Sequence, residues 1–342
     1  MKKTIYLGLL LSMTSLVKAQ DVHFSNPDYA PLTLNPAMAG LNHNVQLFAN
    51  YRTQWNTVGA PFQTIAASAD FQANAENMER KGILAMGIQL FNDRIGEAAI
   101  ATNNVNFNLA YHVMLDRYQT VGLGMYGGFG QRSLSLMDGT FGNQYINNAF
   151  DPSAGTGENL GASPTFNFFD LGAGLVYNFN GETSSSQENE GLKVTAGYAV
   201  YHINTPSFSF TGNGDDPLYM RHSIFAKGSY GVGKSAIAVE PGMYYHIQGP
   251  NNMFLVGSDV RFFLKSVAAS GETKYSSAAI GAFLRNNDAF IARAMYQFNG
   301  MGAGLSYDFN TSSLNEITRS RGGMEIFLVW QMDGRSRKLV AN

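Results

Sequence analysis

The stretch MGAGLSYDF at 301–309 decides the fold. Its odd positions are Met, Ala, Leu, Tyr and Phe, whereas its even positions are Gly302, Gly304, Ser306 and Asp308. An apolar side chain at every second residue indicates a β-strand with one apolar and one polar face. The segments 105–113 and 171–179 alternate in the same way. Segments of this length match a tilted strand that crosses a membrane.

The same pattern predicts fourteen strands, and an even number is typical of single-chain bacterial barrels. Turn sequences such as Asn286-Asn287 and Asn299-Gly300 join neighbouring segments. A soluble β-sandwich also alternates, but rarely with so many strands of this length. We therefore expect an all-β fold, a transmembrane antiparallel β-barrel over 45–332. Its strands are expected near 45–55, 62–72, 82–91, 101–113, 119–131, 166–179, 192–203, 219–231, 235–247, 252–264, 276–285, 288–298, 300–309 and 323–332.

The composition favours the same class of protein. Charged residues make up 14% of the chain, against about 25% in soluble domains, and aromatic residues make up 13%. Beyond the amino-terminal leader, no segment offers the roughly 20 consecutive apolar residues of a membrane helix. A closed barrel is the other structure that spans lipid, because closure satisfies every backbone hydrogen bond. The net charge of −2 gives no indication of a nucleic-acid partner.

The first nineteen residues have the features of a secretory signal peptide. Lys2 and Lys3 precede an apolar run over 5–11, and small or aliphatic residues surround Ala19. We expect cleavage between Ala19 and Gln20. An amino-terminal membrane anchor is the alternative, but the apolar run is too short for one. The chain has no cysteine, so lipoprotein acylation, disulfides and thiolate chemistry are excluded.

Residues 20–44 do not follow the strand pattern. Pro27, Pro31 and Pro36 each remove a backbone donor, so this segment cannot form a membrane strand. We expect a stiff, irregular plug at the periplasmic mouth of the barrel, with a disordered leader as the alternative. Asn35 is expected to hold a local turn, and Gly40 to permit a sharp turn into the first strand. The side chains expected to pack into the lumen or its mouth are Phe24, Tyr29, Leu32, Leu34 and Met38.

The connections between the predicted strands differ in length. Three of the longest, at 132–165, 204–218 and 310–322, fall at one end, which we expect to face outside. The connections at the other end are mostly short, with 181–190 and 265–275 as exceptions. Charges on the polar faces should point into the lumen, since a charge facing mid-bilayer lipid costs roughly 2–4 kcal/mol. They either pair and fill the lumen, which we favour, or line a permeation path. They are Asp170, Arg221, Glu240, Asp259, Arg261, Arg293, Asp308 and Glu325.

Two glycine-rich motifs resemble nucleotide sites. GSYGVGKS at 228–235 matches the phosphate-binding loop pattern, but the alternating residues that follow, with Pro241, argue against the required helix. We interpret it as a hairpin turn, and GLGMYG at 122–127 as part of a strand whose glycines leave room on the lumen face. No nucleophile elbow or metal-ligand spacing is present. GNGDDP at 212–217 is a polar turn or, less favoured, a calcium loop. We expect no enzyme activity, cofactor or metal.

Five short motifs carry a family resemblance. They are NPAMAG at 35–40, YRTQW at 51–55, NDRIG at 92–96, AYH at 110–112 and LSYDFN at 305–310. In order and spacing they resemble the PorP/SprF family of type IX secretion outer-membrane proteins over residues 21 to about 332. The tail 333–342 departs from the pattern, because the chain does not end on an aromatic residue after the last strand.

The resemblance implies a role in secretion and cell-surface attachment of a cargo protein, adhesin-like and gliding-related in some members. The implied partners are outer-membrane lipid, a secreted type IX cargo and periplasmic components of the machine. A FadL-like channel for hydrophobic molecules is the alternative, and a barrel protease or lipase lacks a site. Plug and partner candidates are Phe24, Tyr29, Pro31, Leu34, Asn35, Pro36 and Gly40, and the barrel residues of the family motifs are Tyr51, Arg52, Trp55, Asp93 and Arg94.

Overall fold

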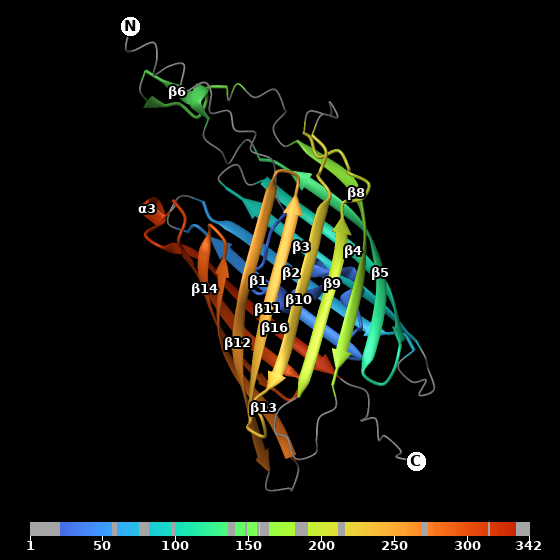
Figure 1. Ribbon diagram of the computed structural model, residues 1–342. Coiled ribbons are helices and arrows are strands. Elements are labelled where there is room, and N and C mark those ends of the chain that lie inside the picture. The colour runs from blue at the N-terminus through green and yellow to red at the C-terminus, as the bar shows by residue number, and fades with distance from the viewer. Residues whose placement is uncertain are drawn as a thin grey trace.

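Fourteen antiparallel strands form a closed barrel in the computed structural model (Figure 1). Each strand pairs with the next one along the chain, and β16 closes the ring on β1. The structure describes residues 21–332 except 57–59, 75–81, 97–99, 136–140, 148, 156, 158–163, 182–190, 211–215, 268–272 and 314. The predicted signal peptide, the tail 333–342 and most of the candidate calcium loop therefore lie outside the described residues.

The barrel strands confirm the predicted number, and their bounds differ from the predicted ones by a few residues. They are β1 (Val45–Gln54), β2 (Phe62–Gln72), β3 (Gly82–Ile95), β4 (Ile100–Met114), β5 (Gln119–Ser133), β8 (Thr165–Asn180), β9 (Leu192–Tyr201), β10 (Arg221–Gly231), β11 (Ile237–Gln248), β12 (Asn251–Val267), β13 (Thr273–Arg285), β14 (Ala289–Phe298), β15 (Met301–Asn310) and β16 (Arg321–Met332).

Closure of the ring depends on the pairing of β1 with β16. The register extends from Val45 opposite Met332 to Gln54 opposite Gly323 without a shift. β3 extends four residues past its predicted end, because Asn92 and Asp93 pair with Asn103 and Thr102 of β4. The backbone ladder therefore continues where the alternation of apolar side chains has ended.

The two faces of the barrel have opposite chemistry. Outward side chains such as Phe107, Leu123, Phe169 and Ile280 are at least 60% exposed and form an apolar outer surface. The eight charges predicted to point inward do so, and they pair with one another or with other lumen groups. Arg261 contacts Glu240 at 2.7 Å, for example. Pairing that fills the lumen was the favoured prediction, and it is confirmed.

The two ends of the barrel also differ. The long-loop end holds the β5–β8 connection with η3 (Gly142–Gln144), β6 (Tyr145–Ile146) and β7 (Ala149–Phe150), the β9–β10 connection, and the β15–β16 connection with α3 (Asn315–Thr318) (Figure 1). The short-turn end holds the turns at 115–118, 232–236 and 299–300, besides the longer connection 181–191. Among the residues that the structure describes, no helix is long and apolar enough to span a membrane.

The phosphate-loop motif is a hairpin turn, as predicted. The amide of Val232 donates to the carbonyl of Ile237 at 2.9 Å, and strand β11 follows where a nucleotide site needs a helix. The second glycine motif lies within β5, also as predicted.

We expect tags in connections at opposite ends of the barrel to differ in accessibility on intact cells. A tag after Gly155 or Gly212, both in connections of the long-loop end, should be labelled from outside. A tag after Ser185, in a connection of the short-turn end, should be labelled only after the outer membrane is permeabilised. Antibody labelling of whole cells measures this, and the reverse pattern would contradict the orientation.

We expect Lys234→Ala to leave assembly and secretion unchanged, because a turn that joins two strands does not need the ammonium group of Lys234. Cargo at the cell surface should equal wild type when barrel levels are equal. Loss of cargo at normal barrel levels would restore the nucleotide interpretation.

Candidate functional site

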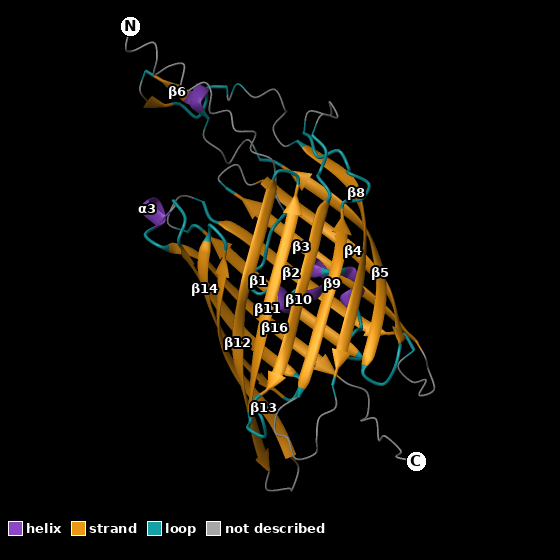
Figure 2. Cartoon of the chain, in the orientation of Figure 1, coloured by secondary structure: helices purple, strands orange, loops and turns teal. Residues whose placement is uncertain are grey.

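The amino-terminal segment 21–44 lies inside the barrel, where its short helical turns are seen behind the front strands (Figure 2). It contains three short helical turns, η1 (Pro27–Tyr29), α2 (Pro31–Leu34) and η2 (Pro36–Met38). Asp21 donates its amide to Gln248 at the long-loop end, whereas Gly40 donates to Asp70 near the short-turn end of β2. The segment therefore traverses the whole lumen. The sequence placed this chain at the periplasmic mouth with side chains in the lumen or its mouth, and the structure extends it to the long-loop end.

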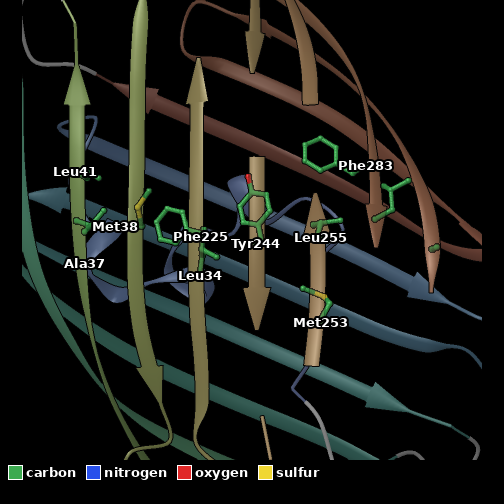
Figure 3. Packing of buried hydrophobic residues seen from close by; sticks show 12 residues of the cluster. Leu34, Ala37, Met38, Leu41, Phe225, Tyr244, Met253, Leu255 and Phe283 are labelled. Carbon is green, nitrogen blue, oxygen red and sulfur yellow. The ribbon is translucent and has the colours of Figure 1, made fainter. Parts of the chain in front are cut away.

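The apolar side chains of the plug, as we call residues 21–44, pack against the inner wall (Figure 3). Leu34 and Met38 belong to a buried cluster with Phe225, Tyr244 and Leu255. Phe24 and Leu32 are likewise buried, as the sequence predicted. Tyr29 is half-buried and stacks on Phe327 of β16 with ring centroids 4.0 Å apart. These contacts remove apolar surface from water, at about 25 cal/mol per Å² buried.

Asn35 has two roles. Its Oδ1 accepts from the amide of Ala37 at 2.8 Å, which is the local turn that the sequence predicted. Its Nδ2 also donates to the carbonyls of Leu175 and Tyr198, at 2.9 and 3.2 Å. Asn35 therefore holds the plug turn and ties it to β8 and β9. Gly40 has φ +60°, a left-handed backbone that favours glycine where the chain turns toward β1.

Glycines of the wall make room for this turn. A Cβ at Gly124 of β5 would lie 2.6 Å from the carbonyl carbon of Pro36 and closer still to Ala37. A Cβ at Gly197 of β9 would lie 2.8 Å from Asn35 Nδ2. In contrast, Gly127 faces outward, and a Cβ there meets only Leu171, at 3.7 Å. Gly124 of the predicted strand 119–131 and Gly197 of β9 thus leave room for the plug at Asn35, Pro36 and Ala37.

A buried ionic cluster lies in the wall beside the plug. Arg52 contacts Asp308 at 2.9 Å and Glu325 at 3.3 Å, and Arg285 contacts Asp308 at 2.9 Å. These groups come from β1, β13, β15 and β16, so the cluster also spans the seam that closes the ring. Buried charges are tolerated only when they are paired and hydrogen-bonded.

Ser25 brings the plug into this cluster. Its amide donates to Glu325 at 2.7 Å, and its hydroxyl donates to Asp308 at 2.6 Å. Its carbonyl accepts from Arg293 at 2.7 Å, and its hydroxyl accepts from Arg52 and Arg285. One small plug residue therefore uses all of its polar atoms on barrel charges. No sequence signal marked Ser25 or the role of Arg285 in this cluster, because the partners that they meet there lie far away along the chain.

Asp28 bridges two strands of the wall. Its carboxylate contacts Lys227 of β10 at 2.9 Å and accepts from Tyr244 of β11 at 2.6 Å. Pairing between these strands skips four residues around Pro241, which has no amide donor. Burial opposes the charge of Asp28, but Lys227, Tyr244 and Arg293, the last at 3.7 Å, surround its carboxylate. The plug thus holds the wall together beside an interrupted ladder.

A second carboxylate secures the long-loop end of the plug. Asp21 Oδ2 lies 2.7 Å from His202 Nε2, and His202 Nδ1 lies 2.9 Å from Asp170 of β8. Burial disfavours the imidazolium, yet the two carboxylates raise the pKa of His202 to about 9. His202 and Arg221 in turn keep the pKa of Asp21 below its ordinary value, against the effect of burial.

The barrel residues of the family motifs are not gathered at one place. Of the five candidates from the motifs at 51–55 and 92–96, only Arg52 contacts the plug, whereas His112 and Asp308 of two other motifs contact it at Ala39 and Ser25. Asp93 is buried on the lumen face and accepts from Thr64 at 2.7 Å. Tyr51 and Arg94 are exposed, and Trp55 packs edge-on against Phe62 at the end of β1. A shared motif therefore does not imply a shared site here.

The fold and the site define a class, a transmembrane β-barrel whose lumen is occupied by its own amino-terminal segment. Comparison with protein families then identifies the chain, because the family described as "Type IX secretion system membrane protein PorP/SprF" matches residues 16–330. The chain belongs to the PorP/SprF family and is an outer-membrane protein. No curated protein matches it in sequence.

Several solved structures are similar at low identity. The Ralstonia pickettii toluene transporter TbuX is 10% identical, with 90% of this chain and 94% of that chain covered and a TM-score of 0.48. A Pseudomonas aeruginosa FadL homologue is also 10% identical, with coverage of 87% and 92% and a TM-score of 0.45. The translocator domain of autotransporter NalP from Neisseria meningitidis is 11% identical, with 90% and 96% covered and a TM-score of 0.39. At these values, nothing about a ligand or partner of this chain follows.

We expect Arg52→Ala to lower the free energy of unfolding by about 3–5 kcal/mol, because it leaves Glu325 buried without its arginine. Urea unfolding of the purified barrel in detergent measures this change. Arg94→Ala, at an exposed position of a neighbouring family motif, is the control and should change the value by about 0.5 kcal/mol or less. Equal losses in the two variants would contradict a stabilising role for the cluster.

Proposed function

We propose that this protein is a non-enzymatic component of type IX secretion that supports secretion or surface attachment of a cargo protein. The family supports a secretion role in general. The observation that carries the finer proposal is the plug, which crosses the lumen and uses its backbone and side chains on charges of the wall. A barrel filled in this way is suited to holding a cargo protein and to passing a signal across the membrane, rather than to free diffusion of solutes.

The plug connects the two ends of the barrel. Asp21 is anchored at the long-loop end, and the chain enters β1 at the short-turn end. With the expected orientation, cargo would meet the outer end and periplasmic components of the machine the inner end. A cargo contact that shifts the plug would therefore change the surface offered to the machine. The plug residues that we propose to take part in this communication between cargo and machine are Phe24, Tyr29, Pro31, Leu34, Asn35, Pro36 and Gly40.

We expect deletion of residues 24–40, with the signal peptide and cleavage site retained, to abolish surface display of the cargo while the barrel still inserts. Immunoblotting of outer membranes and whole-cell cargo labelling measure the two outcomes separately. Normal cargo display from the inserted deletion variant would show that the plug is dispensable. Leakage of small hydrophobic solutes, with cargo display retained, would favour a FadL-like channel instead.

A single substitution in the wall tests the same proposal without deleting any part of the plug. Gly124→Val should displace the turn at Pro36 and Ala37 without removing any plug residue, because its side chain would occupy the space of their backbone. Gly127→Val adds the same side chain on the outer face of the same strand, where space is available. Cargo display should fall in the first variant only. Equal display in both variants at equal barrel levels would contradict a plug-dependent function.

A further inference from the structure

An arginine at the long-loop end of the lumen lies on aromatic rings. Arg132 is the penultimate residue of β5, and its guanidinium carbon lies 4.2 Å from the ring centre of Phe208 and 5.9 Å from that of Phe210. Both rings belong to the β9–β10 connection. A guanidinium on aromatic faces keeps its edge, with the N–H donors, available for a further partner.

The phenylalanine rings around Arg132 pack against one another. Phe166 of β8 packs edge-on against Phe208 and Phe210, with centroids 5.6 and 5.0 Å apart, and Phe168 packs against Phe208 at 5.2 Å. The connection that carries two of these rings is held by backbone pairs. Phe208 donates to Asp216 at 2.8 Å, and Leu218 donates to Pro206 at 2.9 Å. The loop therefore holds its rings over the lumen wall.

Arg132 differs from the other arginines of the lumen. Arg52, Arg221, Arg261, Arg285 and Arg293 each contact a carboxylate within 4.0 Å. By contrast, Arg132 has no hydrogen bond or ion pair with any residue that the structure describes. A donor that lacks a protein partner is better satisfied by a bound acceptor, so this position favours a ligand that accepts hydrogen bonds.

Asp93 does not supply the missing partner. Asp93 of β3 lies opposite Thr102 of β4, which in turn lies opposite Arg132 of β5. The backbones at Asp93 and Arg132 are therefore two strand spacings, or about 10 Å, apart. Its carboxylate accepts instead from Thr64 of β2, on the side of β3 away from Arg132. Among the residues that the structure describes, no carboxylate therefore lies within ion-pair distance of Arg132 at the half-buried rim of the lumen, and Asp93 attracts its charge only from further away.

We propose that Arg132 and the four phenylalanines, which we call the rim site, bind a carboxylate carried on an apolar or aromatic body. The planar fork of arginine matches both oxygens of a carboxylate. Phenylalanine rings offer apolar area and ring stacking but no hydrogen-bond partner for hydroxyl groups, so they favour an apolar or aromatic body. Two sources share this chemistry, the free carboxyl terminus of a polypeptide with an apolar last residue and a small aromatic acid. The rim site is independent of the role proposed for the plug.

The test uses the full-length mature barrel in detergent and two probes. One probe is a fluorescent pentapeptide that ends in Phe, as the free acid or as the carboxyl-terminal amide, measured by fluorescence anisotropy. The other is phenylacetate, measured by its competition with the peptide and by titration calorimetry. We expect the acid to bind at least about tenfold more tightly than the amide, because the charged acceptor pairs with Arg132. Equal binding of acid and amide, or no binding of either probe, would overturn the proposal.

Matched variants locate the site. Arg132→Gln should abolish the preference for the acid. Arg117→Gln should retain it, although Arg117 also lies over a ring, that of Tyr118 at 4.7 Å, at the other end of the barrel. Phe208→Ser should weaken binding of the acid and of phenylacetate alike. If phenylacetate alone binds in an Arg132-dependent manner, the source is a small acid; if the peptide binds as well, it is a chain terminus. An unchanged preference in Arg132→Gln would contradict the assignment.

Discussion

A closed ring of fourteen strands satisfies its own backbone, but it encloses more space than the inward side chains can fill. The rest of the structure depends on how that space is occupied. Here the chain supplies its own filling, residues 21–44, which cross the lumen between the two ends. The segment is irregular because of its prolines, and irregular backbone is tolerated at membrane depth only where protein groups satisfy it.

The wall meets that requirement with charges. Arginine side chains donate to polar atoms of Ser25, and carboxylates accept from them. Asp28 and Asp21 of the plug form ion pairs with Lys227 and His202. The charges around Ser25 also pair with one another across the β16–β1 seam. Plug and barrel closure are consequently coupled, since a change that withdraws the plug leaves several buried charges with fewer partners. Such coupling suits a protein that passes a signal between two sides of a membrane.

The strands and the plug could be predicted from the sequence, but most contacts between the plug and the wall could not. Asn35 and Gly40 were identified because turn chemistry is local, and the burial of Leu34 and Met38 followed from their apolar side chains in an exported barrel. Ser25 was missed because a serine has no pattern of its own, and its partners in β15 and β16 lie near the other end of the chain. Arg94 and Asp93 belong to one motif, yet a period of two places neighbouring residues on opposite faces.

The sequence by itself determined the number of strands, the face to which each side chain points and the exclusion of the plug segment from the ladder. These properties depend on residues within a few positions of one another, through alternation and through the missing amide of proline. Only the tertiary structure decided which charges meet, that the plug runs the full depth of the lumen, and that Arg132 is left with aromatic rings alone. Those outcomes depend on ring closure and strand stagger, which bring residues hundreds of positions apart to the same height in one confined space.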